Sequence, residues 1–130
     1  MTTVLAPLPS PAVAVSLVEQ GLRWRDAVFL ASKLQIPLEE LARYIGVSSG
    51  TFFSRKNKRF TADESDHLMR FATIWNCAMN AFEDEVGAAT WLKEGQIGLG
   101  GAVPLEYART ETGARRVETL LNRIDFGLTA

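Results

Sequence analysis

The spacing of the apolar residues constrains the fold of this 130-residue chain more than any other feature. Ala27, Val28, Ala31 and Leu34 are placed at i, i+1, i+4 and i+7, and such a stripe indicates one buried face of an α-helix. Similar spacing recurs in residues 38–45 and in residues 117–124. Few segments alternate apolar and polar residues as a half-buried strand does. We therefore predict an all-α fold.

Capping residues, prolines and glycines divide this pattern into separate helices. Gly46 is expected to end one helix, and Thr61 with Glu64 three residues later forms a capping box that begins another. Thr110 is expected to cap the last helix. Four glycines make residues 95–101 a turn-rich loop. The helices predicted in this way cover residues 12–20, 24–35, 37–45, 50–56, 62–82, 85–93, 104–109 and 111–124.

Charge is distributed unevenly along the chain, although the net charge is only −1. Residues 1–60 hold eight Lys or Arg against four Asp or Glu, whereas residues 61–130 hold six against eleven. Half of the positive charge of the first segment lies between residues 55 and 59. A compact basic cluster on an otherwise acidic protein suggests a localised contact with a polyanion.

Two short amphipathic helices that meet at Gly46, followed by the basic cluster, have the layout of a DNA-reading helix-turn-helix. Ala42 is small where the helices approach each other, and Gly46 suits a turn with positive φ. Val47 and Phe52 are expected to close the small core between the helices. A helical hairpin with a solvated basic end is the alternative, and the charge asymmetry favours the DNA-binding interpretation.

The predicted DNA-contacting residues fall into three chemical groups. Hydroxyl groups can reach phosphates or base edges, an aromatic ring can touch a thymine methyl, and cations can contact the phosphate backbone. The hydroxyl residues are Ser48, Ser49, Thr51 and Ser54, the aromatic residue is Phe53, and the cations are Arg55, Lys56, Lys58 and Arg59.

Several classes of function are disfavoured by what the chain contains. Cys77 is the only cysteine and His67 the only histidine, so an internal disulfide and a cysteine-rich zinc site are both impossible. His67 is expected in an acidic, solvated first turn and Cys77 among the core residues of a long helix, so we expect no enzyme activity, metal or cofactor. No apolar run approaches the ~20 residues of a membrane helix. The N-terminus has no positive residue before its apolar stretch, so we do not expect it to be a signal peptide. A cytoplasmic protein without membrane contact is expected.

Four segments in the second half of the chain carry a more specific pattern. They are residues 89–92 (ATWL), 99–105 (LGGAVPL), 110–117 (TETGARRV) and 121–127 (LNRIDFG). Together with residues 55–66 (RKNKRFTADESD), and in this order, they resemble the Xre/MbcA/ParS antitoxin family. The segment from Ala42 to Phe52 resembles the Xre/Cro-type helix-turn-helix. The resemblance covers roughly residues 15–130 and divides the chain into a flexible arm (1–11), a helix-turn-helix region (12–66) and a helical toxin-binding domain (67–130).

The resemblance implies the antitoxin of a bacterial type II toxin–antitoxin pair. Its partner would be a RES-domain toxin that degrades NAD, and the C-terminal end of the chain would cover the active site of that toxin. The antitoxin would also bind operator DNA, as a homodimer, and repress its own operon. The residues expected to bind the toxin are Arg123, Asp125, Phe126, Gly127 and Leu128.

Two questions stay open at this level. The chain could instead be an Xre-type transcriptional regulator whose second half only dimerises and which has no toxin partner. The broad apolar face of residues 68–82 could be a dimer surface, but packing within the core explains it equally well.

Overall fold

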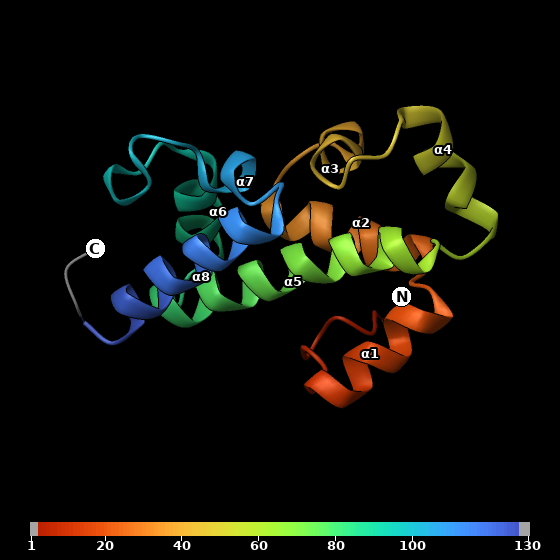
Figure 1. Cartoon of the computed structure of the whole chain (residues 1–130), viewed down its shortest axis with the longest axis horizontal. Helices are drawn as coiled ribbons and strands as arrows, with labels where there is room; N and C mark the ends of the chain where they lie inside the picture. The colour runs from red at the N-terminus through yellow and green to blue at the C-terminus, as the bar shows by residue number, and fades with distance from the viewer. Residues whose placement is uncertain (1–2, 128–130) are drawn as a thin grey trace. The chain divides into compact units, whose positions relative to one another are not determined.

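The computed structural model describes residues 3–127, and it contains helices and turns but no strand in that range (Figure 1). The all-α prediction is confirmed. The chain divides into two compact units, residues 1–72 and 73–130. The boundary falls within the longest helix, α5 (Ala62–Phe82). Among the described residues, no helix is both long enough and apolar enough to cross a membrane.

Unit 1 contains α1 (Pro11–Gln20), α2 (Trp24–Leu34), α3 (Leu38–Tyr44), α4 (Ser49–Phe53), the 3₁₀ helix η1 (Ser54–Asn57) and the first part of α5. Helices α3 and α4 form the expected helix-turn-helix. Gly46 turns the chain with φ +76°, a conformation that glycine adopts without steric cost. Ala42 and Phe52 are fully buried between the two helices, as predicted, whereas Val47 is only half-buried.

The core of unit 1 joins the helix-turn-helix to α2 and α5. The ring centroids of Trp24 and Phe60 lie 5.3 and 5.4 Å from that of Phe52. Trp24 precedes Phe52 in the sequence and Phe60 follows it. Buried Ser65 on α5 accepts a hydrogen bond of 2.8 Å from the backbone N–H of Leu22. These contacts fix the start of α2 and the start of α5 beside α4. The largest buried apolar side chains here are Leu22, Leu30, Leu34, Leu41, Ile45, Phe52, Phe60, Leu68 and Phe71.

Residues 3–10, expected to be a flexible arm, are tied to α2 in the structure. Buried Asp26 accepts hydrogen bonds from the hydroxyl of Thr3 (2.7 Å) and the backbone N–H of Val4 (3.1 Å). Leu5 is itself buried. Ser10 then caps α1, which begins one residue before the predicted start of that helix.

Unit 2 contains the end of α5, α6 (Glu85–Lys93), the 3₁₀ helix η2 (Ile97–Leu99), α7 (Pro104–Tyr107) and α8 (Glu111–Asp125). Thr110 caps α8 as predicted, because its hydroxyl accepts a hydrogen bond of 3.0 Å from Gly113 N–H. A Cβ atom on Gly113 would overlap the carbonyl oxygen of Tyr107. The turn between α7 and α8 therefore requires glycine here. The core of the unit is built from Ile74, Ala78, Leu92, Leu105, Ala108, Val117 and Leu121.

Two predicted helices are shorter in the structure. The helix expected over 50–56 is α-helical only as far as Phe53 and continues as η1. The hydroxyl of Ser54 donates to the carbonyl oxygen of Thr51 at 2.6 Å, and such a bond competes with the regular helix ladder. The helix expected over 104–109 ends at Tyr107. In the 95–101 loop, Gly100 and Gly101 have φ of +67° and +90°.

Candidate functional site

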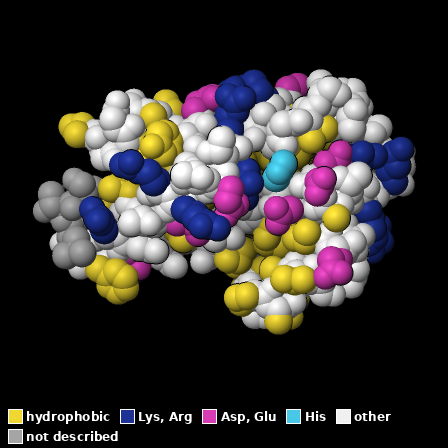
Figure 2. Space-filling model, in the orientation of Figure 1, with side chains coloured by type: hydrophobic (Ala, Val, Ile, Leu, Met, Phe, Trp, Pro, Cys, Tyr) yellow, Lys and Arg dark blue, Asp and Glu magenta, His cyan; other side chains and the backbone are white. Residues whose placement is uncertain are grey.

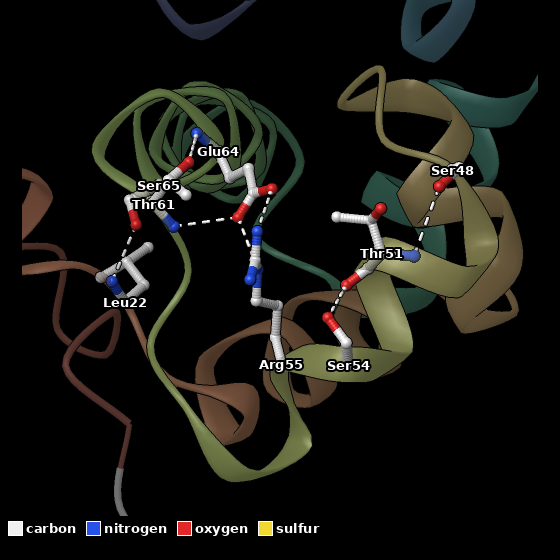
Figure 3. Close-up of polar contacts among 8 residues, drawn as sticks. All are labelled: Leu22, Ser48, Thr51, Ser54, Arg55, Thr61, Glu64 and Ser65. Atoms are coloured by element: carbon white, nitrogen blue, oxygen red, sulfur yellow. Dashed lines mark hydrogen bonds and ion pairs between the residues drawn. The ribbon is translucent and has the colours of Figure 1, made fainter.

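Helix α4 presents an exposed row of hydroxyl groups. Ser48 caps the helix, and its side chain accepts a hydrogen bond of 3.3 Å from Thr51 N–H (Figure 3). Ser48, Ser49, Thr51 and Ser54 are all exposed. The side chains predicted to contact DNA through hydroxyls therefore lie on one exposed helix and its two ends, although Ser48 and Ser54 each also make a local bond within it.

Arg55 forms a bidentate ion pair instead of pointing freely into solvent. Its Nε donates to Oε1 of Glu64 and its Nη2 donates to Oε2, both at 2.9 Å (Figure 3). The two side chains are only 15% and 12% exposed. This pair ties η1 to the start of α5, so Arg55 positions the loop, and its contact with DNA stays a prediction.

Glu64 also completes the predicted capping box of α5. Its Oε1 accepts from Thr61 N–H at 2.9 Å, and its own N–H donates to the Thr61 hydroxyl at 3.2 Å. The hydrogen bonds from Arg55 are the main reason why the pKa of Glu64 is lowered, and partial burial opposes them. The pKa of Arg55 is raised for the same reason. The carboxylate is held ionised between a cation and a helix end.

The other three cations of the cluster differ in how they are held. Arg59 Nη1 donates to the carbonyl oxygen of Gly21 at 2.8 Å, so this guanidinium is also engaged within the fold. Lys56 is exposed, with its Nζ over the ring of Phe53 at 5.3 Å. Lys58 is exposed. Lys and Arg side chains gather at the right-hand edge of Figure 2, where α4 and η1 lie.

Phe53 is half-buried, and its ring centroid lies 5.4 Å from that of Trp24 and 5.6 Å from that of Phe52. The ring is packed against these neighbours on one side. Its predicted contact with a thymine methyl would therefore have to use the remaining half of its surface.

His67 has a structural contact that its sequence position did not indicate. We expected it in a solvated first turn, but it is half-buried, and Nδ1 lies 2.9 Å from the carbonyl oxygen of Ile45. This contact joins α5 to the end of α3. No group of three or more His, Cys, Asp or Glu side chains capable of holding a metal ion occurs in residues 3–127.

Cys77 lies in unit 2 and is half-buried. Burial, with smaller contributions from the negative charges of Glu118 and Asp125, raises the pKa of its thiol to about 11. The thiolate is the reactive form of cysteine. At neutral pH this side chain is therefore a protonated, weakly nucleophilic group.

The residues predicted to bind a toxin lie at the end of α8. Arg123 and Asp125 are exposed, and Phe126 is 79% exposed. Gly127 turns the chain with φ +76°. Leu128, the fifth predicted residue, lies outside the described residues. The structure thus presents a cation, a carboxylate and an aromatic ring within one helical turn.

Sequence reasoning missed a second arginine on the same face of α8. Arg116 and Arg123 are seven residues apart, and with Gly98, Thr119 and Leu120 they line a pocket of about 210 Å³. The Nη2 of Arg116 donates to Gly98 O at 3.4 Å. The seven-residue spacing was the available signal, since residues at i and i+7 share a helix face.

The apolar face of residues 68–82 is largely buried in the core. Leu68, Phe71, Ala72, Trp75 and Ala78 are buried, and only Met79 and Phe82 on this face are half-buried. Core packing therefore accounts for most of this face, and it offers little apolar surface to a second copy of the chain.

Known protein families match both parts of the chain. Residues 13–72 match the family model of the antitoxin Xre-like helix-turn-helix domain. Residues 77–127 match that of the antitoxin Xre/MbcA/ParS C-terminal toxin-binding domain. Both are binding domains, which agrees with the prediction that the chain is not an enzyme.

Two relatives named Antitoxin Xre are similar to this chain. The protein of Yersinia enterocolitica is 34% identical over 96 residues, which are 72% of this chain and 65% of the relative. The protein of Photorhabdus laumondii is 33% identical over 94 residues, which are 70% of this chain and 64% of the relative. The match therefore spans slightly less than two thirds of either relative.

Proposed function

Because the chain belongs to the Xre/MbcA/ParS antitoxin family, we propose that it is the antitoxin of a bacterial type II toxin–antitoxin pair. In this proposal it neutralises a toxin by direct binding and represses its own operon by binding operator DNA, both in the cytoplasm. The observation that carries the proposal is the presence of two binding domains in one chain, a helix-turn-helix followed by a toxin-binding domain.

The toxin is proposed to be a RES-domain protein that degrades NAD. It would be contacted by the end of α8, where Arg123, Asp125, Phe126 and Gly127 precede Leu128. Phe126 supports this assignment, because this aromatic residue is 79% exposed instead of packing into the core of unit 2. Aromatic and arginine side chains dominate the binding energy of many protein interfaces. Covering the active site with this segment would exclude the substrate.

Operator DNA is proposed to bind the exposed side of α4 and η1. The hydroxyls of Ser48, Ser49 and Thr51 would contact phosphates or base edges, and Lys56 and Lys58 would contact the backbone. Arg55 and Arg59 would hold the loop in place through Glu64 and Gly21. A homodimer would place two such surfaces about one helical turn, ~34 Å, apart on the operator.

The experiment that tests the proposal is expression of the neighbouring reading frame, alone and together with this chain. Growth and cellular NAD are measured in both cultures. We expect the neighbour alone to stop growth and deplete NAD, and this chain to restore both. A harmless neighbour would contradict the antitoxin proposal and leave the DNA-binding regulator as the account of this chain.

A further inference from the structure

The basic surface of unit 1 extends beyond the predicted cluster, because the start of α2 brings two more arginines beside η1. Arg23 immediately precedes α2 and Arg25 lies in its first turn. They line one pocket of about 270 Å³ together with Trp24, Arg55, Lys56, Asn57 and Lys58. None of these lining residues is acidic, so the pocket has the electrostatic character of an anion site.

Arg25 has a buried donor that the fold does not satisfy. Its Nε is buried and has no hydrogen-bond partner among the described residues. A buried donor without an acceptor is unfavourable. Phosphate oxygens match the planar fork of a guanidinium, which binds them by paired hydrogen bonds. Arg25 lines the pocket, and its Nε lacks an acceptor among the described residues.

The nearby carboxylates are already engaged with other donors. Asp26 receives hydrogen bonds from Thr3, Val4 and the backbone N–H of Arg23. Glu64 is paired with Arg55. Across residues 3–127, the structure shows no ion pair that uses the side chain of Arg23, Arg25, Lys56 or Lys58. Four cations therefore surround the pocket without a protein counter-charge.

Packing around Trp24 holds the pocket in shape. The indole ring contacts the buried ring of Phe52, with the centroids 5.3 Å apart, and the ring of Phe53 at 5.4 Å. Lys56 Nζ lies 5.8 Å from the centroid of Trp24, which is within the range of a cation–π contact. A site whose groups are already positioned loses less conformational freedom when a ligand binds.

We propose that Arg23, Arg25, Lys56 and Lys58 form a phosphate site that holds a backbone phosphate of bound DNA. This inference rests on the proposed DNA-binding function and adds to it two residues at the start of α2, outside the helix-turn-helix itself. The site would recognise a phosphate group. Free inorganic phosphate carries the same group and is the alternative ligand. The DNA phosphate bound here would lie beside the part of the DNA backbone that η1 is proposed to contact.

The test measures binding of the full chain to a duplex carrying the region upstream of its own reading frame. Fluorescence anisotropy gives the association constant between about 50 and 200 mM salt. In Arg23→Ala and Arg25→Ala, the slope of log K against log salt is expected to fall in magnitude by about one per cation. Arg115→Ala is the matched control, because it removes an exposed arginine of α8 that pairs with Glu111. That control should keep the parent slope.

Arg25 is partly buried, so Arg25→Lys is tested beside Arg25→Ala, with thermal melting to establish that each variant folds. If neither Arg25 variant folds, the exposed Arg23 decides the question. Parent slopes in Arg23→Ala and Arg25→Ala, with a reduced slope in Lys58→Ala, would overturn the phosphate site and leave DNA binding intact.

If the parent chain does not bind DNA, the proposed DNA-binding function itself fails. Titration with inorganic phosphate, followed through the Trp24 indole N–H resonance, then separates the two sources. A saturating shift that is lost in Arg23→Ala would support a site for free phosphate. No shift would overturn the phosphate site altogether.

Discussion

At the scale of single residues, Arg55 and Glu64 show why charge alone does not identify a binding surface. Both belong to a segment in which a basic cluster precedes an acidic helix start. In the structure they form a bidentate pair with 2.9 Å bonds, and the same carboxylate caps α5. The pair therefore holds the loop that carries Lys56 and Lys58, whose side chains are exposed.

Glu64→Gln should lower the free energy of unfolding by about 1.5–3 kcal/mol at neutral pH, the usual range for hydrogen bonds to a charged group. The pKa of Glu64 is lowered in the folded state from its ordinary 4.5. Its contribution is therefore complete above about pH 4.5 and is lost as the pH falls through the lowered folded-state pKa. Urea unfolding at several pH values measures this difference.

Glu19→Gln, at an exposed position of α1, is the control and should change the stability little at any pH. A loss of stability in Glu64→Gln that stays constant down to strongly acidic pH would contradict an ionised Glu64 as the source of the effect.

The same local reasoning applies to the thiol of Cys77. With a pKa of about 11, only a very small fraction is thiolate near neutral pH. We expect alkylation by iodoacetamide in the native chain to be far slower than in the urea-unfolded chain at pH 8 and to accelerate towards pH 11. Rapid alkylation of the folded chain at neutral pH would contradict the half-buried, protonated thiol.

At the scale of elements, the helices could be predicted where local chemistry decides them. The Thr61–Glu64 capping box, the Thr110 cap and the Gly46 turn all occur as expected. The change from α4 to η1 could not be predicted from periodicity, because it accompanies one hydroxyl bond from Ser54 to the backbone. Bounds of the shortest helices depend on such single contacts.

The turn between α7 and α8 gives a prediction of this kind. Gly113→Ala should destabilise the chain by about 1–3 kcal/mol, as overpacking does, because the new methyl group would overlap Tyr107 O. Gly50→Ala in α4 is the matched control, since beyond its chain neighbours and the backbone of its own helix no atom lies within 4 Å of the place that its methyl group would occupy. That change should be neutral or stabilise by up to about 1 kcal/mol. Equal melting temperatures for both variants would contradict the assigned role of Gly113.

At the scale of the whole molecule, each unit carries a surface that neither composition nor spacing fully revealed. The charge asymmetry drew attention to residues 55–59, but the fold adds Arg23 and Arg25 from a distant segment of the sequence. In the same way, the spacing of Arg116 and Arg123 places them on one face of α8, but they line a pocket only because Gly98 lies beside that helix. The sequence indicates which helices carry these sites. Which side chains complete each site depends on tertiary contacts, which the sequence pattern does not reveal.

The exposed ring at the end of α8 leads to a prediction about the toxin complex. Phe126→Ala should weaken binding to the toxin by at least ~2 kcal/mol, roughly 30-fold in Kd, as loss of an aromatic interface anchor does. Val86→Ala, on the exposed side of α6, is the control and should bind like the parent chain. Calorimetric titration measures both, and parent affinity in Phe126→Ala would remove this residue from the proposed interface.

Inhibition in a purified system tests whether this chain neutralises a toxin by binding it. NAD consumption by the purified product of the neighbouring reading frame is measured while the purified chain is added. We predict that activity falls in proportion to the chain added and is abolished once the toxin is saturated. Full NAD consumption in the presence of excess chain would contradict it.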